Sequence, residues 1–274
     1  MIEIILNILK SQTNSKMRLS LCILVFLLFY IGSCTKNRKS IDEIPKDCEE
    51  LQALGIIDSF AYPIRPGSIE WESLENQDAK WDAVNVPDAI LEDMCTHGLV
   101  YTCAYCPLFL ILTVYNNIYT GFVSLRDHIN SFDELINRDD AGIELFNYYQ
   151  TLFDTTWQSI GQIESQVQIL HTEIFFAQQE YLGKFNVSEE LDVLLEAYNI
   201  LLDKETHQLD IDCINGSYYL ICNILYYNME YEPLISFIDR EELNNFLNDI
   251  RPISDESRDS LKYYTELFLL DNKK

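Results

Sequence analysis

The stretch EELDVLLEAYNILL at residues 189–202 decides the fold class. Its apolar side chains recur at steps of three and four residues, which places them along one face of an α-helix. They are Leu191, Leu194, Leu195, Tyr198, Leu201 and Leu202. The stretch therefore predicts an amphipathic helix that packs its apolar face against other elements.

The same helical spacing continues on both sides of this stretch. No proline occurs between Pro107 and Pro233, so every residue in that span has the backbone donor that a helix interior requires. Apolar residues keep the helical step at Phe122, Leu125, Ile129, Phe132 and Ile136, at Leu145, Tyr149 and Leu152, at Ile163, Val167, Leu170, Ile174 and Ala177, at Ile214, Tyr218, Ile221 and Leu225, and at Leu261, Tyr264 and Phe268. Strand-like alternation is not sustained anywhere in the sequence. We therefore expect an all-α, multi-helix fold.

Prolines and capping residues indicate where some of these helices begin. Pro87 suits the first position of a short helix at residues 88–94. Thr96 is expected to cap the next helix, and Ser131 to begin another through a capping box with Glu134.

The spacing of five glycines raises the question of an internal repeat. Gly98, Gly121, Gly142, Gly161 and Gly183 lie 23, 21, 19 and 22 residues apart. If glycines mark helix ends, helix pairs recur at about 40 residues, the period of HEAT-like α-solenoids. Since the sequences between the glycines do not repeat, an irregular helical bundle is an equal alternative.

Near the N-terminus, residues 19–34, LSLCILVFLLFYIGSC, follow a cationic start that contains Lys16 and Arg18. The apolar run is short for a transmembrane helix but matches the core of a removable signal peptide. Its end, IGSC, resembles the lipobox of bacterial lipoproteins, in which the cysteine becomes the acylated first residue of the mature chain. We expect residues 1–33 to be a removed signal peptide and Cys34 to carry the lipid. The alternative is an uncleaved anchor helix.

The residues around this signal indicate which methionine starts translation and to which membrane the protein is sorted. Met17 gives a more ordinary signal peptide than Met1. Position 35 is Thr rather than Asp, which by analogy with lipoprotein sorting favours the outer membrane. The first acids after Cys34 are Asp42 and Glu43, so the cue for surface export is weak, and we expect a periplasm-facing protein with surface exposure left open.

We expect the mature chain to consist of a short tether and one domain. Residues 35–40 are polar and basic, and we expect residues 34–45 to form a lipidated tether. Residues 46–274 are expected to be one helical domain, irregular up to about residue 83, where Trp71 and Trp81 can pack on the core.

Charge excludes one class of partner. The sequence contains 44 acidic and 19 basic residues, for a net charge of −25. A surface this negative repels phosphate backbones, so nucleic acid is not an expected partner. With 48% hydrophobic residues, the chain is expected to be globular rather than disordered.

Six cysteines remain once Cys22 and Cys34 are set aside. They are Cys48, Cys95, Cys103, Cys106, Cys213 and Cys222. In an exported chain an even number favours disulfides, but six thiols allow 15 pairings. Cys213 and Cys222 lie nine residues apart on one predicted helix, a rise of about 13 Å, which is too long for a disulfide. We expect these two to be buried free thiols.

The run CTHGLVYTCAYC at residues 95–106 contains the residue types that bind zinc. His97, Cys103 and Cys106, with Cys95, could supply thiolate and imidazole ligands. Large apolar neighbours and the absence of knuckle glycines argue against a metal, and the lack of a βαβ context argues against a redox pair. We expect core cysteines or a structural disulfide here, with zinc as the alternative.

Catalytic signatures are absent from the sequence. It contains no GxSxG, P-loop, GxGxxG or HExxH motif, and its four histidines are dispersed. The acid pairs at 139–140, 189–190 and 241–242 lie at predicted helix starts, where acids complement the helix dipole. We expect no cofactor, and the balance leans away from an enzyme.

Four blocks resemble an uncharacterised family of lipoproteins from Gram-negative gut bacteria. They are YPIRPGSIEW at 62–71, VPDAILEDMCTHGLVYTCAYCPLF at 86–109, NN and GF within 116–122, and ELINRDDA at 134–141. Cys95 stands where that family has serine, Cys106 where it has tyrosine, and Val86 where it has isoleucine. The resemblance implies that Cys95 is a poor zinc ligand and that Thr96 is the helix cap. It brings no known activity.

These observations give one leading hypothesis and two alternatives. The leading hypothesis is a non-catalytic, lipid-anchored scaffold whose concave, acidic, tyrosine-rich surface binds an envelope protein or peptide. One alternative is an envelope hydrolase or zinc protein that uses His97, Cys103 and Cys106. The other is a glycan-binding accessory lipoprotein.

Overall fold

The computed structural model describes residues 48–115, 117–156, 163–236, 240–249 and 253–272. Within these residues the regular elements are helices and no strand is present. The prediction of an all-α, multi-helix fold is therefore confirmed.

The first part of the described chain consists of short helices joined by irregular segments. These are α3 (Cys48–Ala53), α4 (Ile69–Glu72), α5 (Gln77–Ala83), α6 (Asp88–Asp93) and α7 (Thr96–Ala104). Trp71 in α4 and Trp81 in α5 are both buried, as predicted. They fix the irregular lead-in to the core of the molecule.

The middle of the chain turns back on α7. It contains the 3-10 helix η2 (Phe109–Thr113), α8 (Ile118–His128) and α9 (Asn130–Asn137). The helical run breaks at Ile129, which has extended backbone angles, and not at Ser131. The predicted capping box is therefore wrong, because Ser131 lies inside α9 and is fully buried.

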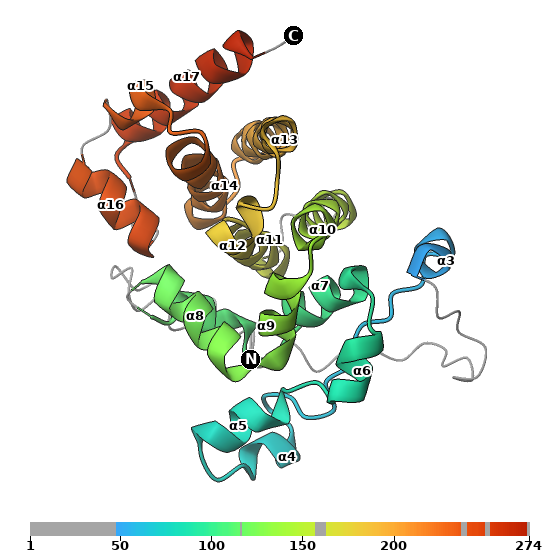
Figure 1. Cartoon of the computed structure of the whole chain (residues 1–274). Coiled ribbons are helices and arrows are strands. Elements are labelled where there is room, and N and C mark those ends of the chain that lie inside the picture. Colours follow the sequence, from blue (N-terminus) through green and yellow to red (C-terminus); the bar gives the residue numbers. More distant parts are fainter. Residues whose placement is uncertain (1–47, 116, 157–162, 237–239, 250–252, 273–274) are drawn as a thin grey trace.

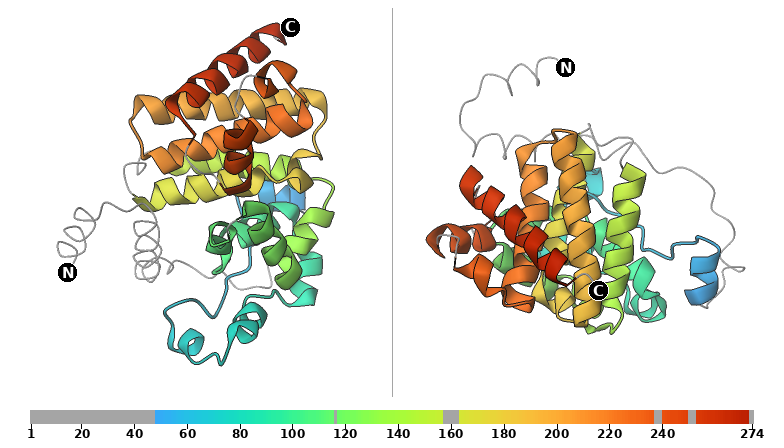
Figure 2. Two further views of the ribbon diagram at one scale, coloured as in Figure 1. Left: turned by 90° about the vertical axis from the view of Figure 1, so that its left-hand side faces the viewer. Right: turned by 90° about the horizontal axis from the view of Figure 1, so that it is seen from above.

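Long helices form the second half. These are α10 (Ala141–Thr156), α11 (Ile163–Phe176), α13 (Val187–Thr206), α14 (Ile211–Asn223) and α17 (Asp255–Asp271), with the shorter α12 (Gln179–Leu182), the π-helix η4 (Ile224–Asn228), α15 (Glu232–Ile235) and α16 (Arg240–Asp249) between them. α11 and α13 both pack on α14. Figures 1 and 2 show the molecule as a stack of helices, with α4 and α5 at one end and α17 crossing the other.

Helix α13 contains the stretch that predicted the fold class. Asn186 caps it: its side chain accepts hydrogen bonds from the backbone of Ser188 and Glu189, and Glu189 accepts one from Asn186 in return. This capping box confirms the predicted role of Glu189. The buried face includes Leu194 and Leu201, but Leu195 is exposed. Val193, Ala197 and Ile200 are buried instead, so the buried face is rotated relative to the predicted one.

The glycines do not mark a repeat. Gly98, Gly121 and Gly142 lie inside α7, α8 and α10, and Gly183 follows α12, while Gly161 lies outside the described residues. Gly121 is required by close packing, since a Cβ there would lie 2.6 Å from the carbonyl oxygen of Leu112. The glycine spacing therefore gives no support to a 40-residue period.

Several tyrosines are buried in the core rather than exposed on a surface. Among the described residues, seven tyrosines are buried: Tyr62, Tyr148, Tyr149, Tyr181, Tyr198, Tyr218 and Tyr219. Several donate their hydroxyl to a glutamate on another helix, as Tyr218 does to Glu205 at 2.8 Å. These seven tyrosines therefore belong to the core and are not available to a binding face.

Candidate functional site

Cys34, the predicted lipidation site, lies outside the described residues. Among the helices that the structure describes, none has the length and apolar character needed to cross a membrane.

The residues proposed as zinc ligands do not come together. His97 is partly exposed and faces α10, with Nδ1 3.1 Å from Oε2 of Glu144. Cys103 is fully buried and donates its thiol to the carbonyl of Ser131. Six residues along a helix separate two side chains by about 120°, so His97 and Cys103 face different surroundings. In the described ranges no group of three or more His, Cys, Asp or Glu side chains could hold a metal. The described geometry therefore gives no support to the zinc alternative at this cluster.

Burial also keeps the thiols of Cys103 and Cys106 in their protonated, unreactive form. It raises the pKa of Cys103 well above its usual range, and it raises the pKa of Cys106 to about 12. Thiols act as nucleophiles and metal ligands in their deprotonated form, so at neutral pH these two act as small apolar core residues.

The structure pairs Cys48 with Cys95 in a disulfide, with their Cα atoms 5.7 Å apart. The sequence left this pairing open. Cys213 and Cys222 are free and buried along the continuous α14, as predicted. Thr96 does not cap α7, because its hydroxyl donates to Oδ1 of Asp140 at 2.7 Å.

The N-cap residue of α7 is Cys95, which makes no side-chain capping bond but is held by the lead-in. The backbone N–H of Cys95 donates to Oδ2 of Asp58 at 2.9 Å. Farther along, the Phe60 N–H donates to the Thr102 hydroxyl at 2.9 Å, and the Tyr62 hydroxyl donates to the Thr102 carbonyl at 3.1 Å. The bond from Tyr62 to Thr102 thus joins the sequence blocks at 62–71 and 86–109.

A buried ion pair joins α11, α13 and α14. Nζ of Lys204 lies 2.8 and 2.7 Å from the two carboxylate oxygens of Glu173, and both side chains are fully buried. The Cys213 carbonyl accepts a third bond from Lys204 at 2.9 Å. Tyr149 and Ser217 donate to Glu173 at 2.9 and 2.6 Å. The charges are fully hydrogen-bonded, which is the condition under which a buried pair is tolerated.

Sequence reasoning missed this network. Glu173 and Lys204 look like ordinary residues of amphipathic helices, and 31 positions separate them. Gly216 was the available signal: a Cβ there would lie 2.3 Å from Oε2 of Glu173. Each charged side chain has its partners inside the core, so the network stabilises the fold and is not open to a substrate.

His171 gives the fold a pH dependence. Burial lowers the pKa of His171 to about 4, against about 6.5 in an unfolded chain. Between these values the unfolded state binds the extra proton, so stability is complete above pH 6.5 and falls as the pH drops towards 4. The difference corresponds to about 3 kcal/mol of unfolding free energy at and below pH 4.

Chemical denaturation at pH 7 and pH 4 measures this effect. The wild type should lose more stability between the two pH values than a His171→Leu variant does. His207→Leu, at an exposed position, is the matched control and should follow the wild type. Superimposable pH profiles for wild type and His171→Leu would contradict the assignment.

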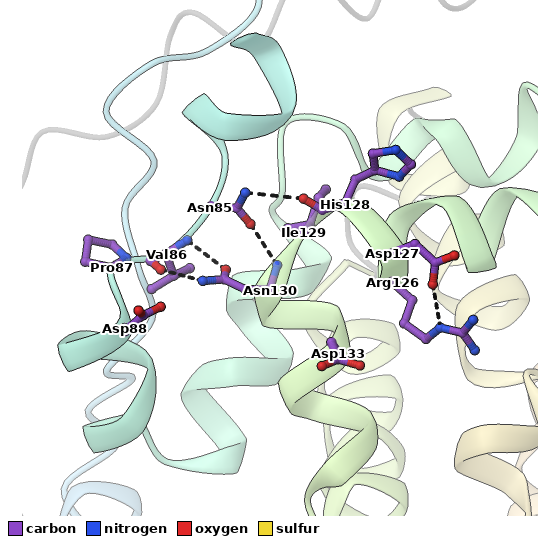
Figure 3. Close-up of a pocket in the computed structure, with 10 residues that line it drawn as sticks. All are labelled: Asn85, Val86, Pro87, Asp88, Arg126, Asp127, His128, Ile129, Asn130 and Asp133. Carbon is purple, nitrogen blue, oxygen red and sulfur yellow. Dashed lines mark hydrogen bonds and ion pairs between the residues drawn. The ribbon is translucent and has the colours of Figure 1, made fainter. Parts of the chain in front are cut away.

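One concave surface of the described residues is a polar groove, drawn in Figure 3, with a volume of about 760 Å³. Its lining comes from the α5–α6 link, the end of α8 and the start of α9. The lining residues are Asn85, Val86, Pro87, Asp88, Arg126, Asp127, His128, Ile129, Asn130 and Asp133. The groove lies where two segments that are distant in sequence, residues 85–88 and 126–133, meet.

Two asparagines hold the walls of the groove together. Oδ1 of Asn130 accepts the Val86 N–H at 2.9 Å, and its side-chain amide donates to the Val86 carbonyl at 2.6 Å. Asn85 reciprocates, because its Oδ1 accepts the Asn130 N–H at 2.8 Å and its amide donates to the His128 carbonyl at 3.3 Å. These bonds fix the chain at Ile129 and explain why the helical run breaks there. The groove is preformed.

The electrostatic character of the groove is acidic. Three exposed aspartates, Asp88, Asp127 and Asp133, line it with one arginine, and Arg126 already contacts Asp127 at 3.0 Å. The His128 ring stacks on Trp81 at 4.7 Å, and its Nδ1 bonds to the Ser124 carbonyl at 2.8 Å. The ten lining residues include neither serine nor cysteine. The arrangement suits recognition of a positively charged group.

Comparisons of the chain with models of known protein families, with curated proteins and with solved structures found no match.

Proposed function

We propose that the protein is an exported lipoprotein, anchored through Cys34 in the outer membrane, whose helical domain binds a positively charged protein segment in the groove. The observation that carries the anchoring is the IGSC lipobox at the end of residues 19–34. The Cys48–Cys95 disulfide supports it, because stable disulfides are typical of oxidising compartments.

The anchoring is tested by metabolic labelling with a fatty acid and by membrane fractionation. Cys34→Ala should abolish the label, because the acylated thiol is gone. It should also prevent formation of the mature lipoprotein. Cys22→Ala is the matched control: this cysteine lies inside the expected signal peptide, and its loss should leave labelling and fractionation unchanged. Label that persists in Cys34→Ala would contradict the proposal.

The acidic groove supports the binding role. Its three aspartates raise the local concentration of cationic groups, and they belong to a chain with a net charge of −25. The fixed Asn85 and Asn130 side chains keep the walls in place, so a partner encounters a shape that needs little reorganisation. We assign the partner to the proteins of the envelope because the anchor would hold the domain there.

Site-specific photocrosslinking in intact cells tests this role. A photoreactive residue replacing Asp88 should give one dominant crosslinked species, which weakens when Asp127→Asn and Asp133→Asn are added. A probe at Asp259, an exposed acid on α17, is the control and should not give that species. Identical products at both positions, or none at Asp88, would contradict a binding groove.

A further inference from the structure

A loop of the lead-in is held at both ends by a single residue of the core. Its first residue, Cys48, is bonded covalently to Cys95. At its other end, Asp58 accepts the backbone N–H of the same Cys95 at 2.9 Å. The segment from Cys48 to Asp58 is therefore a closed loop that projects from the start of α7.

The tip of this loop is apolar and exposed. Leu54 is 59% exposed, Ile56 36% and Ile57 41%. Gly55 has a φ of 64°, and the Ile56 N–H donates to the Leu51 carbonyl at 2.9 Å, which is the Schellman arrangement that ends α3. Since Leu51 is buried, α3 sits on the domain while the residues after it face outwards. The backbone presents this apolar tip in a fixed conformation.

The loop lies next to the proposed anchor in the sequence. Cys34 and Cys48 are 14 positions apart, so the intervening chain spans at most about 50 Å. Figures 1 and 2 place α3 at the edge of the molecule opposite α8, the helix that supplies Arg126, Asp127 and His128 to the groove. A domain held with α3 towards the bilayer would turn that part of the groove away from it.

We propose that the tip, Leu54 to Ile57, inserts into the interfacial region of the bilayer that holds the Cys34 lipid. This inference rests on the proposed anchoring. Aliphatic side chains gain free energy when they leave water for the acyl boundary. Three such side chains bind a membrane weakly alone, but the anchor makes their insertion an intramolecular step with a high effective concentration. The acidic Glu50 on α3 stays in water, which limits the contact to the tip.

A fluorescent reporter at the tip tests the insertion. The purified lipidated protein carries Leu54→Cys, labelled with an environment-sensitive maleimide dye, in phosphatidylcholine vesicles with or without nitroxide-bearing lipids. The free thiols of the described part are Cys103, Cys106, Cys213 and Cys222, and all are buried, so the introduced cysteine is the accessible one. Ile69→Cys on α4, where the native side chain is 86% exposed, is the matched control.

The expected result is a several-fold rise in emission, a blue shift and strong quenching for the label at position 54, with little change at position 69. A label at 54 that stays unquenched on protein that floats with the vesicles would overturn the insertion while leaving the anchoring intact. Equal quenching at both positions would also overturn it, because the contact would not belong to the loop. Protein that fails to float would overturn the anchoring and the insertion together.

Discussion

Lys204→Met should lower the unfolding free energy by about 3–5 kcal/mol, because it leaves the Glu173 carboxylate buried without its cation. The hydroxyls of Tyr149 and Ser217 would still donate to Glu173, but two neutral donors do not replace an ammonium group in a fully buried site. Equilibrium denaturation at neutral pH measures the loss. Lys262→Met is the matched control: its pair with Glu205 is partly exposed, and such pairs contribute about 1 kcal/mol or less.

A double variant separates two costs in unfolding free energy: that of an unpaired buried charge and that of the lost side chain. Glu173→Leu with Lys204→Met removes both charges at once and should be less destabilised than the sum of the two single variants. Coupling arises because each single variant leaves one charge unpaired, which the double variant avoids. Additive losses would contradict the account, since they would mean that the two side chains act independently.

Removal of the disulfide should also have a large effect. Replacing Cys48 and Cys95 with alanine is expected to lower stability by about 2–4 kcal/mol, because the bond closes a loop between positions 47 residues apart. The wild type treated with a reductant should lose the same amount, whereas the alanine variant should not respond to the reductant. A wild type whose denaturation curve is unchanged by the reductant would contradict the pairing.

Local patterns in the sequence were sufficient for the fold class and for the principal helix. The leucine spacing at 189–202 predicts α13. The nine-residue spacing of Cys213 and Cys222 on one helix correctly predicts that these two thiols are not bonded to each other. Each of these features depends on residues close together in the chain. The break at Ile129 does not, because Asn85 and Asn130 produce it across 45 positions.

The candidate site could not be predicted for the same reason. The groove needs residues 85–88 beside residues 126–133, and their types are those of ordinary loops and helix ends. The sequence pointed instead to His97, Cys103 and Cys106, since residues near in sequence look like a cluster. A helix distributes such residues over different faces, and only the packing of α7 decides which of them face the core.

In the proposed function, Cys34 becomes the lipidated first residue of the mature chain. Mass spectrometry of the N-terminal peptide from protein purified out of membranes tests it most directly. The account predicts a peptide that begins at Cys34 and has the added mass of a diacylglyceryl group and an amide-linked acyl chain. A mature chain that retains residues 19–33, or that has an unmodified Cys34, would contradict it.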